Sequence, residues 1–284
     1  MREVCMRLAW VVAVALVLPV SAAAQTLERI RDSGVLKVGY REDAAPYSYK
    51  NKIGQPAGYT VTLCQAVATD IADEVGLAEL AIEYVPVGTG DRFSALQEGR
   101  IDLLCGATTA TLTRRKLIDF SVPTFIDGAG VLLRADGPDN FAGLAGQSVG
   151  VRAATTTEEA LRNTLRRQGM EAEVVPVDSH EDGLARLEAG EISAYFADQA
   201  ILIFLMSGSQ AAENLKLGEG QFTLEPYALG MQRGDDDFRL SVDTSLSRLY
   251  RSGEVDRIFR NSFGANATQS EALRALYLIS ALPE

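Results

Sequence analysis

The sequence predicts an α/β protein of two lobes, each a mainly parallel sheet flanked by helices. Apolar runs typical of strands alternate with helical spacing over residues 35–105, which is the pattern of a parallel sheet wrapped by helices. The same alternation recurs over residues 128–198, and a further strand and two amphipathic helices follow residue 228. The chain therefore crosses twice between the lobes, so the first lobe is discontinuous and a hinged cleft is expected.

The first lobe is expected to comprise residues 25–124 and 228–284. A short helix over 27–31 ends at Gly34, and a longer helix with apolar positions from Val61 to Val75 ends at Gly76. A third helix over 93–98 ends at Gly99. The strands are expected at 35–40, at 81–87 and from Ile101, and residues 118–128 are expected to lead away from this sheet.

The second lobe is expected to span residues 128–223, with hinge crossings near 124–128 and 223–228. Its predicted strands are 128–133, 148–152, 173–177 and 192–198, and its predicted helices begin near 141, 153 and 179. Thr156 and Glu159 fit a capping box at the second of these helices. The chain then returns with a strand over 229–232 and helices over 238–250 and 255–263. The tail, 269–282, is an amphipathic helix that we expect to pack on a lobe rather than recruit a partner.

Residues 1–24 have the pattern of a cleaved secretory signal peptide. Arg2 and Arg7 precede an apolar run over 8–20, and an Ala-x-Ala pattern predicts cleavage after Ala24. The run is short for a membrane span, although an N-terminal anchor is the alternative. We therefore expect the chain to be exported, and the resemblance described below places the mature protein in the periplasm. The net charge of −11, or −12 without residues 1–24, argues against nucleic acid and anionic membranes as partners.

Cysteine and histidine usage bounds the chemistry further. Cys64 and Cys105 remain after signal cleavage, and two cysteines in an oxidising compartment predict a disulfide bond. His180 is the only histidine and no Cys/His cluster exists, so we expect neither a metal nor a cofactor.

Each loop that follows a strand of the first lobe carries an arginine. Arg41 follows the first strand, Arg92 follows the second, and Arg114 ends the stretch that begins with Cys105 and Gly106. Because the carboxyl ends of parallel strands meet at one edge of a sheet, the three guanidinium groups should converge there. Backbone N–H groups, threonine hydroxyls and a guanidinium suit a carboxylate, so the sequence predicts an anion site.

An ordered set of short motifs adds a resemblance over residues 27–264. The motifs are Val38-Gly39, Pro46-Tyr47, Gly58-Tyr59, Asp102-Leu103, Arg114-Arg115-Lys116, Asp119-Phe120-Ser121, Gly150-Val151, Leu187-Glu188, Pro226-Tyr227 and Ser252-Gly253-Glu254. In this order they resemble the family 3 extracellular solute-binding proteins, the periplasmic polar amino-acid receptors of ABC importers. The resemblance implies the two-lobed periplasmic binding protein type II fold with a two-stranded hinge. It also implies a monomer that closes on one amino acid and delivers it to an ABC permease.

The resemblance implies roles for particular residues. Arg114 matches the arginine that holds the ligand α-carboxylate, and Asp198 matches the acid that holds the α-ammonium group. Other residues matching ligand contacts are Ala107 and Thr109 in the first lobe and Thr155 and Thr156 in the second.

Specificity is expected from a second group of residues, Arg41, Thr89, Arg92 and His180. These match the side-chain pocket of glutamate/aspartate receptors, although Ala107 replaces the serine typical of those receptors. A dicarboxylic amino acid brings two negative charges and one positive charge. Because an unpaired buried guanidinium is unfavourable, the arginines imply an anionic ligand. We expect glutamate or aspartate, and a broader set of polar amino acids is the alternative.

Several residues keep two interpretations. Tyr47 is either a wall of the ligand pocket or a core residue, and Arg152 either contacts the ligand or braces its loop. His180 begins a helix and could serve as a capping residue instead of a ligand contact. Asp43 is most simply a partner for a neighbouring arginine. Two functional alternatives also remain: a receptor that feeds a sensor, and a cyclohexadienyl-dehydratase-like enzyme on the same fold, which would need a general acid in the cleft.

Overall fold

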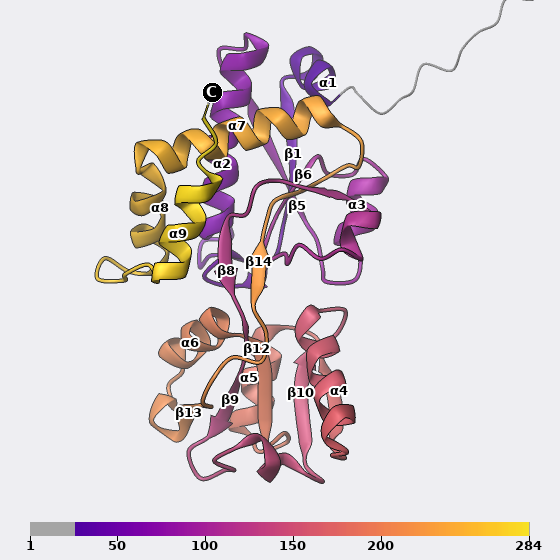
Figure 1. Ribbon diagram of the computed structural model, residues 1–284, viewed down its shortest axis with the longest axis vertical. Coiled ribbons are helices and arrows are strands. Elements are labelled where there is room, and N and C mark those ends of the chain that lie inside the picture. Colours follow the sequence, from indigo (N-terminus) through magenta and orange to yellow (C-terminus); the bar gives the residue numbers. More distant parts are fainter. Residues whose placement is uncertain (1–25, 284) are drawn as a thin grey trace, which may run out of the picture.

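The computed structural model describes residues 26–283 and has two α/β lobes, one above the other in Figure 1. The type II two-lobed fold predicted from the sequence is therefore observed. The predicted signal peptide lies outside the described residues. No described helix combines the length and the apolar character that crossing a membrane requires.

The first sheet has the strand order β5-β1-β6-β15-β7. Strands β1 (Val35–Tyr40), β5 (Ala81–Pro86) and β6 (Leu103–Cys105) are parallel, as predicted. Strand β15 (Gly230–Met231) then pairs antiparallel with both β6 and β7 (Asp119–Phe120). The expectation that residues 118–128 simply leave the sheet was wrong, because β7 lies within this segment and pairs with β15. Strand β15 follows β7 by more than 100 residues in the sequence, so no local pattern indicates this pairing.

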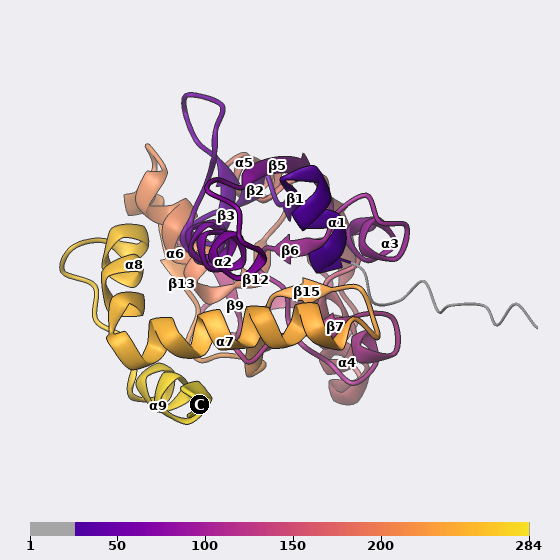
Figure 2. The same cartoon turned by 90° about the horizontal axis from the view of Figure 1, so that it is seen from above.

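Helices cover both faces of this sheet. They are α1 (Thr26–Ser33), α2 (Tyr59–Val75), α3 (Arg92–Gln97), α7 (Asp236–Ser252), α8 (Glu254–Phe263) and α9 (Glu271–Ser280). Figure 2 shows α7 lying across this lobe with α9 alongside it. The tail helix α9 buries Leu273, Leu276 and Tyr277, and the Tyr277 hydroxyl lies 2.6 Å from that of Tyr59. The tail thus packs on the first lobe.

The second sheet has the order β11-β10-β12-β9-β13. Its strands are β9 (Ala129–Arg134), β10 (Ser148–Arg152), β11 (Glu173–Val177), β12 (Ala194–Asp198) and β13 (Leu215–Leu217). Its helices are α4 (Thr156–Gln168), α5 (His180–Glu188) and α6 (Gln199–Gly208), and short 3-10 turns are η1 (Arg114–Lys116), η2 (Phe141–Leu144) and η3 (Ala212–Asn214). Helix α6 and strand β13 were not predicted.

The start of α4 corrects the predicted cap by one residue. Thr155, and not Thr156, is the N-cap, and its hydroxyl accepts from the Glu158 N–H at 3.1 Å. Glu158 in turn accepts from the Ala154 N–H at 2.9 Å. The shift frees the Thr156 hydroxyl for a contact with another segment, described below.

Two short strands connect the lobes. Strand β8 (Phe125–Asp127) pairs antiparallel with β14 (Glu225–Tyr227), and the pair lies between the two sheets in Figure 1. A small sheet of β2 (Asp43–Ala44), β3 (Ser48–Lys50) and β4 (Pro56–Ala57) lies beside β1 in sequence. The predicted disulfide is present: Cys64 of α2 is bonded to Cys105 at the end of β6. It therefore ties the strand that precedes Gly106 to the first long helix.

Candidate functional site

A cavity between the lobes collects most of the predicted site residues. It is lined by Arg41, Arg92, Ala107, Thr109, Arg114, Arg152, Thr155, Thr156, His180 and Asp198. Four further lining residues were not predicted: Thr157, Phe196, Ala197 and Ile201. Thr157 and Ile201 lie in the first turns of α4 and α6, and α6 was not predicted from the sequence.

Two of the predicted residues do not line the cavity. Thr89 lies in the loop after β5 and is not among the lining residues. Tyr47 is fully buried, its ring packs against Phe125 at a centroid distance of 5.0 Å, and its hydroxyl donates to Asp127 at 2.7 Å. Tyr47 is thus a core residue at the hinge, because its ring packs against Phe125 of β8.

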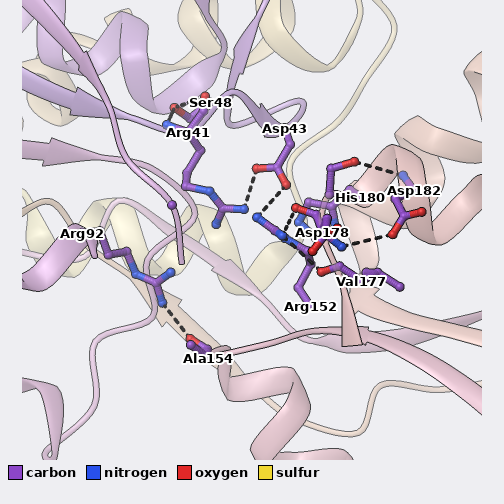
Figure 3. Close-up of polar contacts among 12 residues, drawn as sticks. Arg41, Asp43, Ser48, Arg92, Arg152, Ala154, Val177, Asp178, His180 and Asp182 are labelled. Atoms are coloured by element: carbon purple, nitrogen blue, oxygen red, sulfur yellow. Dashed lines mark hydrogen bonds and ion pairs between the residues drawn. The ribbon is translucent and has the colours of Figure 1, made fainter. Parts of the chain in front are cut away.

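Arg92 is the least satisfied charge in the cavity. It begins α3 at the carboxyl end of the first sheet, is 3% exposed, and donates to the Ala154 carbonyl of the other lobe at 3.3 Å (Figure 3). Its Nε and Nη1 atoms are buried and have no hydrogen-bond partner among the described residues. Burial, together with the charges of Arg114 and Arg41, lowers the pKa of Arg92 to about 9. This guanidinium group is suited to an added anion.

Arg114 approaches the same cavity from the end of the Gly106 loop. Its Nη1 donates to the Thr109 carbonyl at 2.9 Å, and its guanidinium lies over the Phe93 ring at 5.3 Å. Arg92 also lies over Phe93, at 4.8 Å. Phe93 is therefore an aromatic support shared by two arginines, which cation–π attraction holds beside each other despite their like charges.

Arg41 and Arg152 share one carboxylate. Asp43 Oδ1 lies 2.5 Å from Arg41 Nη2, and Asp43 Oδ2 lies 3.1 Å from Arg152 Nη2. Burial by itself would raise the pKa of Asp43, but the charges of Arg41 and Arg152 and the hydrogen bond from Arg41 outweigh it and hold that pKa below its ordinary value. Asp43 is thus the partner expected for Arg41, and in addition it reaches an arginine of the second lobe.

Asp198 lies at the end of β12, facing the arginines. It accepts hydrogen bonds from the Tyr227 hydroxyl and, at 3.0 Å, from the Thr157 hydroxyl. Burial, followed by the charges of Glu225 and Asp127, raises its pKa to about 7. A cation placed against Asp198 would favour the ionised form and reverse this effect.

Each hinge strand carries a buried acid that accepts hydrogen bonds from both lobes. On β14, Glu225 Oε2 accepts from the hydroxyls of Thr109 at 2.5 Å and Thr156 at 2.6 Å. On β8, Asp127 accepts from Tyr47 and from the Ala200 N–H at 3.2 Å. Burial raises the pKa of Asp127 to about 6. Neither acid was predicted as part of the site, although both lie within the predicted hinge crossings.

His180 is held neutral inside the second lobe. Its Nδ1 lies 2.7 Å from the Tyr195 hydroxyl, and burial lowers its pKa to about 3. Tyr195 reaches this position because Gly183 of α5 lacks a side chain: a Cβ there would lie 2.3 Å from the ring. His180 therefore offers the cavity a neutral imidazole edge and is not a counter-charge.

The next feature of the site is its set of charged and metal-ligating side chains. Within residues 26–283, no group of three or more His, Cys, Asp and Glu side chains is arranged to hold a metal ion. The charged groups that line the cavity are four arginines and one aspartate. Such a set can bind a small molecule that carries both negative and positive groups.

Two α/β lobes, a paired-strand hinge and a charged cavity between the lobes define a two-lobed binding protein. The chain belongs to the bacterial extracellular solute-binding proteins, family 3, whose sequence profile matches residues 36–265.

Named relatives cover most of the chain. It is 31% identical over 242 residues to the L-glutamate/L-aspartate-binding protein of Pseudomonas aeruginosa, covering 84% of this chain and 80% of the relative. It is 27% identical over 266 residues to the glutamate/aspartate import solute-binding protein of Salmonella typhimurium, covering 90% and 88%. Among solved structures, an ancestral amino acid-binding protein described as a precursor of cyclohexadienyl dehydratase has a TM-score of 0.73 and 26% identity, covering 84% of this chain and 99% of that one.

Proposed function

We propose that this protein is a periplasmic receptor that captures an acidic L-amino acid, glutamate or aspartate, by lobe closure. It then delivers the ligand to an ABC permease, acting as a binding protein and not as an enzyme. The observation that carries this proposal is Arg92, a buried guanidinium with two N–H-bearing atoms unpartnered among the described residues. Leaving such a charge unpaired is strongly unfavourable, and a ligand carboxylate is the group that would pair it.

The proposed ligand pose follows from the charges around the cavity. Arg114 receives the α-carboxylate and Asp198 receives the α-ammonium group, while Arg92 and Arg41 receive the side-chain carboxylate. Arg41 is already paired with Asp43, so Arg92 has the larger share of the selectivity for an acid. We place further contacts with the ends of the ligand at Ala107, Thr109, Thr155 and Thr156. His180 and Arg152 lie at the border of the ligand, and no ligand contact is assigned to Thr89.

Hydroxyl contacts in the hinge are compatible with this pose. Thr109 and Thr156 donate to Glu225, and their oxygen atoms remain able to accept from an ammonium group. The named relatives that bind glutamate and aspartate support the same ligand class.

Calorimetry of the mature protein with L-glutamate, L-aspartate, L-glutamine and L-arginine tests the specificity. The proposal expects tight binding of one or both acids and weaker binding of the other two. Arg114→Ala should abolish binding of all four, because it removes the α-carboxylate partner. Tight binding of glutamine or arginine with no heat from the acids would refute the acidic specificity.

A dehydratase is the second candidate, and Asp198 is the observation that favours it. Its pKa of about 7 would suit a general acid, and a similar solved structure is described as the precursor of cyclohexadienyl dehydratase. Incubation with prephenate or arogenate, followed spectroscopically for the aromatic product, distinguishes the two. If the wild-type protein forms the product and the Asp198→Asn variant does not, the protein is a dehydratase and the receptor proposal is refuted.

A further inference from the structure

One carboxylate joins arginines of the two lobes at the edge of the cavity. Asp43 contacts Arg41 of its own lobe and Arg152 of the other, and both contacts are visible in Figure 3. We propose that Asp43 is a positioning residue that couples lobe closure to ligand retention through its contact with Arg152. This inference rests on the proposed function, because it concerns the closing of the same site.

The contact crosses the interface between the lobes. Asp43 begins β2, just after β1 of the first lobe, whereas Arg152 is the last residue of β10 in the second lobe. Arg152 is also fixed from behind, since its Nη1 donates to the carbonyls of Val177 and Asp178. Separating the lobes must therefore break the Asp43–Arg152 contact while Arg41 and Asp43 stay together.

Asp43 itself stands outside the ligand cavity. Arg41 and Arg152 line that cavity, but Asp43 lines a neighbouring hollow together with Gly88 and Ser179. The carboxylate thus engages the outer edges of two guanidinium groups. Arg152 Nε remains buried and unpartnered among the described residues, on a side chain that lines the cavity. A ligand bound inside would meet guanidinium groups already oriented from outside.

Burial makes this contact different from its neighbours. The side chains of Arg41, Asp43 and Arg152 are 4%, 10% and 13% exposed, so water and salt screen their charges weakly. Glu42 and Lys50, by contrast, form a 2.7 Å ion pair within the first lobe with both side chains about half exposed. Such a surface pair contributes little, and Glu42→Gln is therefore a matched control next to Asp43.

The test is a double-mutant cycle on the mature protein with L-glutamate as the probe. Asp43→Asn and Arg152→Gln should each weaken binding about 30-fold or more, chiefly through faster dissociation, as for other buried charge pairs. The double variant should bind glutamate no more weakly than whichever single variant binds it less tightly, because both substitutions break the same contact. Asp43→Glu should recover part of the lost affinity, and Glu42→Gln should bind glutamate as the wild type does. Affinity is measured by calorimetry and dissociation by stopped-flow tyrosine fluorescence.

The outcomes separate this inference from the proposed function. Multiplied losses in the double variant, or an unchanged dissociation rate with only a lower melting temperature, would overturn the coupling role. A wild-type protein that binds glutamine in place of glutamate contradicts the acidic specificity alone. The same five variants titrated with glutamine then test Asp43, because its carboxylate lies outside the ligand cavity, and multiplied losses in the double variant would again overturn its coupling role.

Discussion

Replacing Arg92 by methionine should stabilise the ligand-free protein while destroying its affinity for an acid. The guanidinium is 3% exposed, and within residues 26–283 it has a single hydrogen bond, to the Ala154 carbonyl. Its pKa is lowered to about 9, chiefly by burial. At about 1.4 kcal/mol per pH unit, the gap from an ordinary arginine corresponds to roughly 5 kcal/mol of unfavourable free energy.

The sign of this effect follows from linkage. The pKa of Arg92 is lower in the folded chain than in the unfolded chain, so the unfavourable energy is fully present below about pH 9. It is relieved only as the pH rises above that value. Methionine removes it at every pH and retains much of the packing volume, so we expect a gain of about 1–3 kcal/mol after the lost contacts are deducted.

Urea unfolding at pH 7 without ligand measures the first effect, and calorimetry with L-glutamate measures the second. Loss of a buried charge partner should weaken glutamate binding by about 2–5 kcal/mol. Arg115→Met, at an exposed arginine of the η1 turn, is the control and should change neither quantity by more than about 0.5 kcal/mol. A destabilised Arg92→Met protein, or one that binds glutamate as the wild type does, would refute the reasoning.

Four further predictions concern the same site and the residues that support it. Arg41→Ala should weaken glutamate more than glutamine, by about tenfold in the ratio, and calorimetry showing equal losses would remove Arg41 from the side-chain end of the ligand. Ligand affinity should fall as the pH drops below about 7, because Asp198 then takes up a proton and loses its attraction for an ammonium group; the Asp198→Asn variant should lose this pH dependence. The stability of the ligand-free protein should change in the opposite direction. Because the pKa of Asp198 is raised in the folded chain, the contribution of Asp198 to the free energy of unfolding increases as the pH falls from 7 toward 4. Replacing Cys64 and Cys105 together by serine should lower the free energy of unfolding by about 4 kcal/mol, from a separation of 41 residues. Urea unfolding checks this, and an unchanged midpoint would show that the bond constrains little.

The sequence was a good guide to elements whose signals are local. The helices that end at Gly34, Gly76 and Gly99 were predicted from apolar spacing and a following glycine. The meeting of Arg41, Arg92 and Arg114 at one cavity followed from the parallel order of their strands.

The predictions that were wrong or missing concern contacts between segments that are far apart in the sequence. The Thr156 hydroxyl bonds to Glu225, 69 residues away, so a capping motif read from neighbours alone placed the helix start one residue late. Tyr47 bonds to Asp127, 80 residues away, and the pairing of Asp43 with Arg152 likewise has no local pattern. These contacts depend on how the two lobes face each other, which local periodicity does not encode.

The position of β15 has a consequence for how the chain acquires its structure. In the first sheet β15 lies between β6 and β7, and those two strands have no direct pairing with each other. Residues 230–231 must therefore arrive before the sheet is complete, whereas the sheet over residues 129–217 is contiguous in sequence. Closing long loops slows folding, so a chain that emerges from its N-terminus should finish the inserted lobe first. The lobe that contributes Arg41, Arg92 and Arg114 would mature last, after the strand that completes its sheet has emerged.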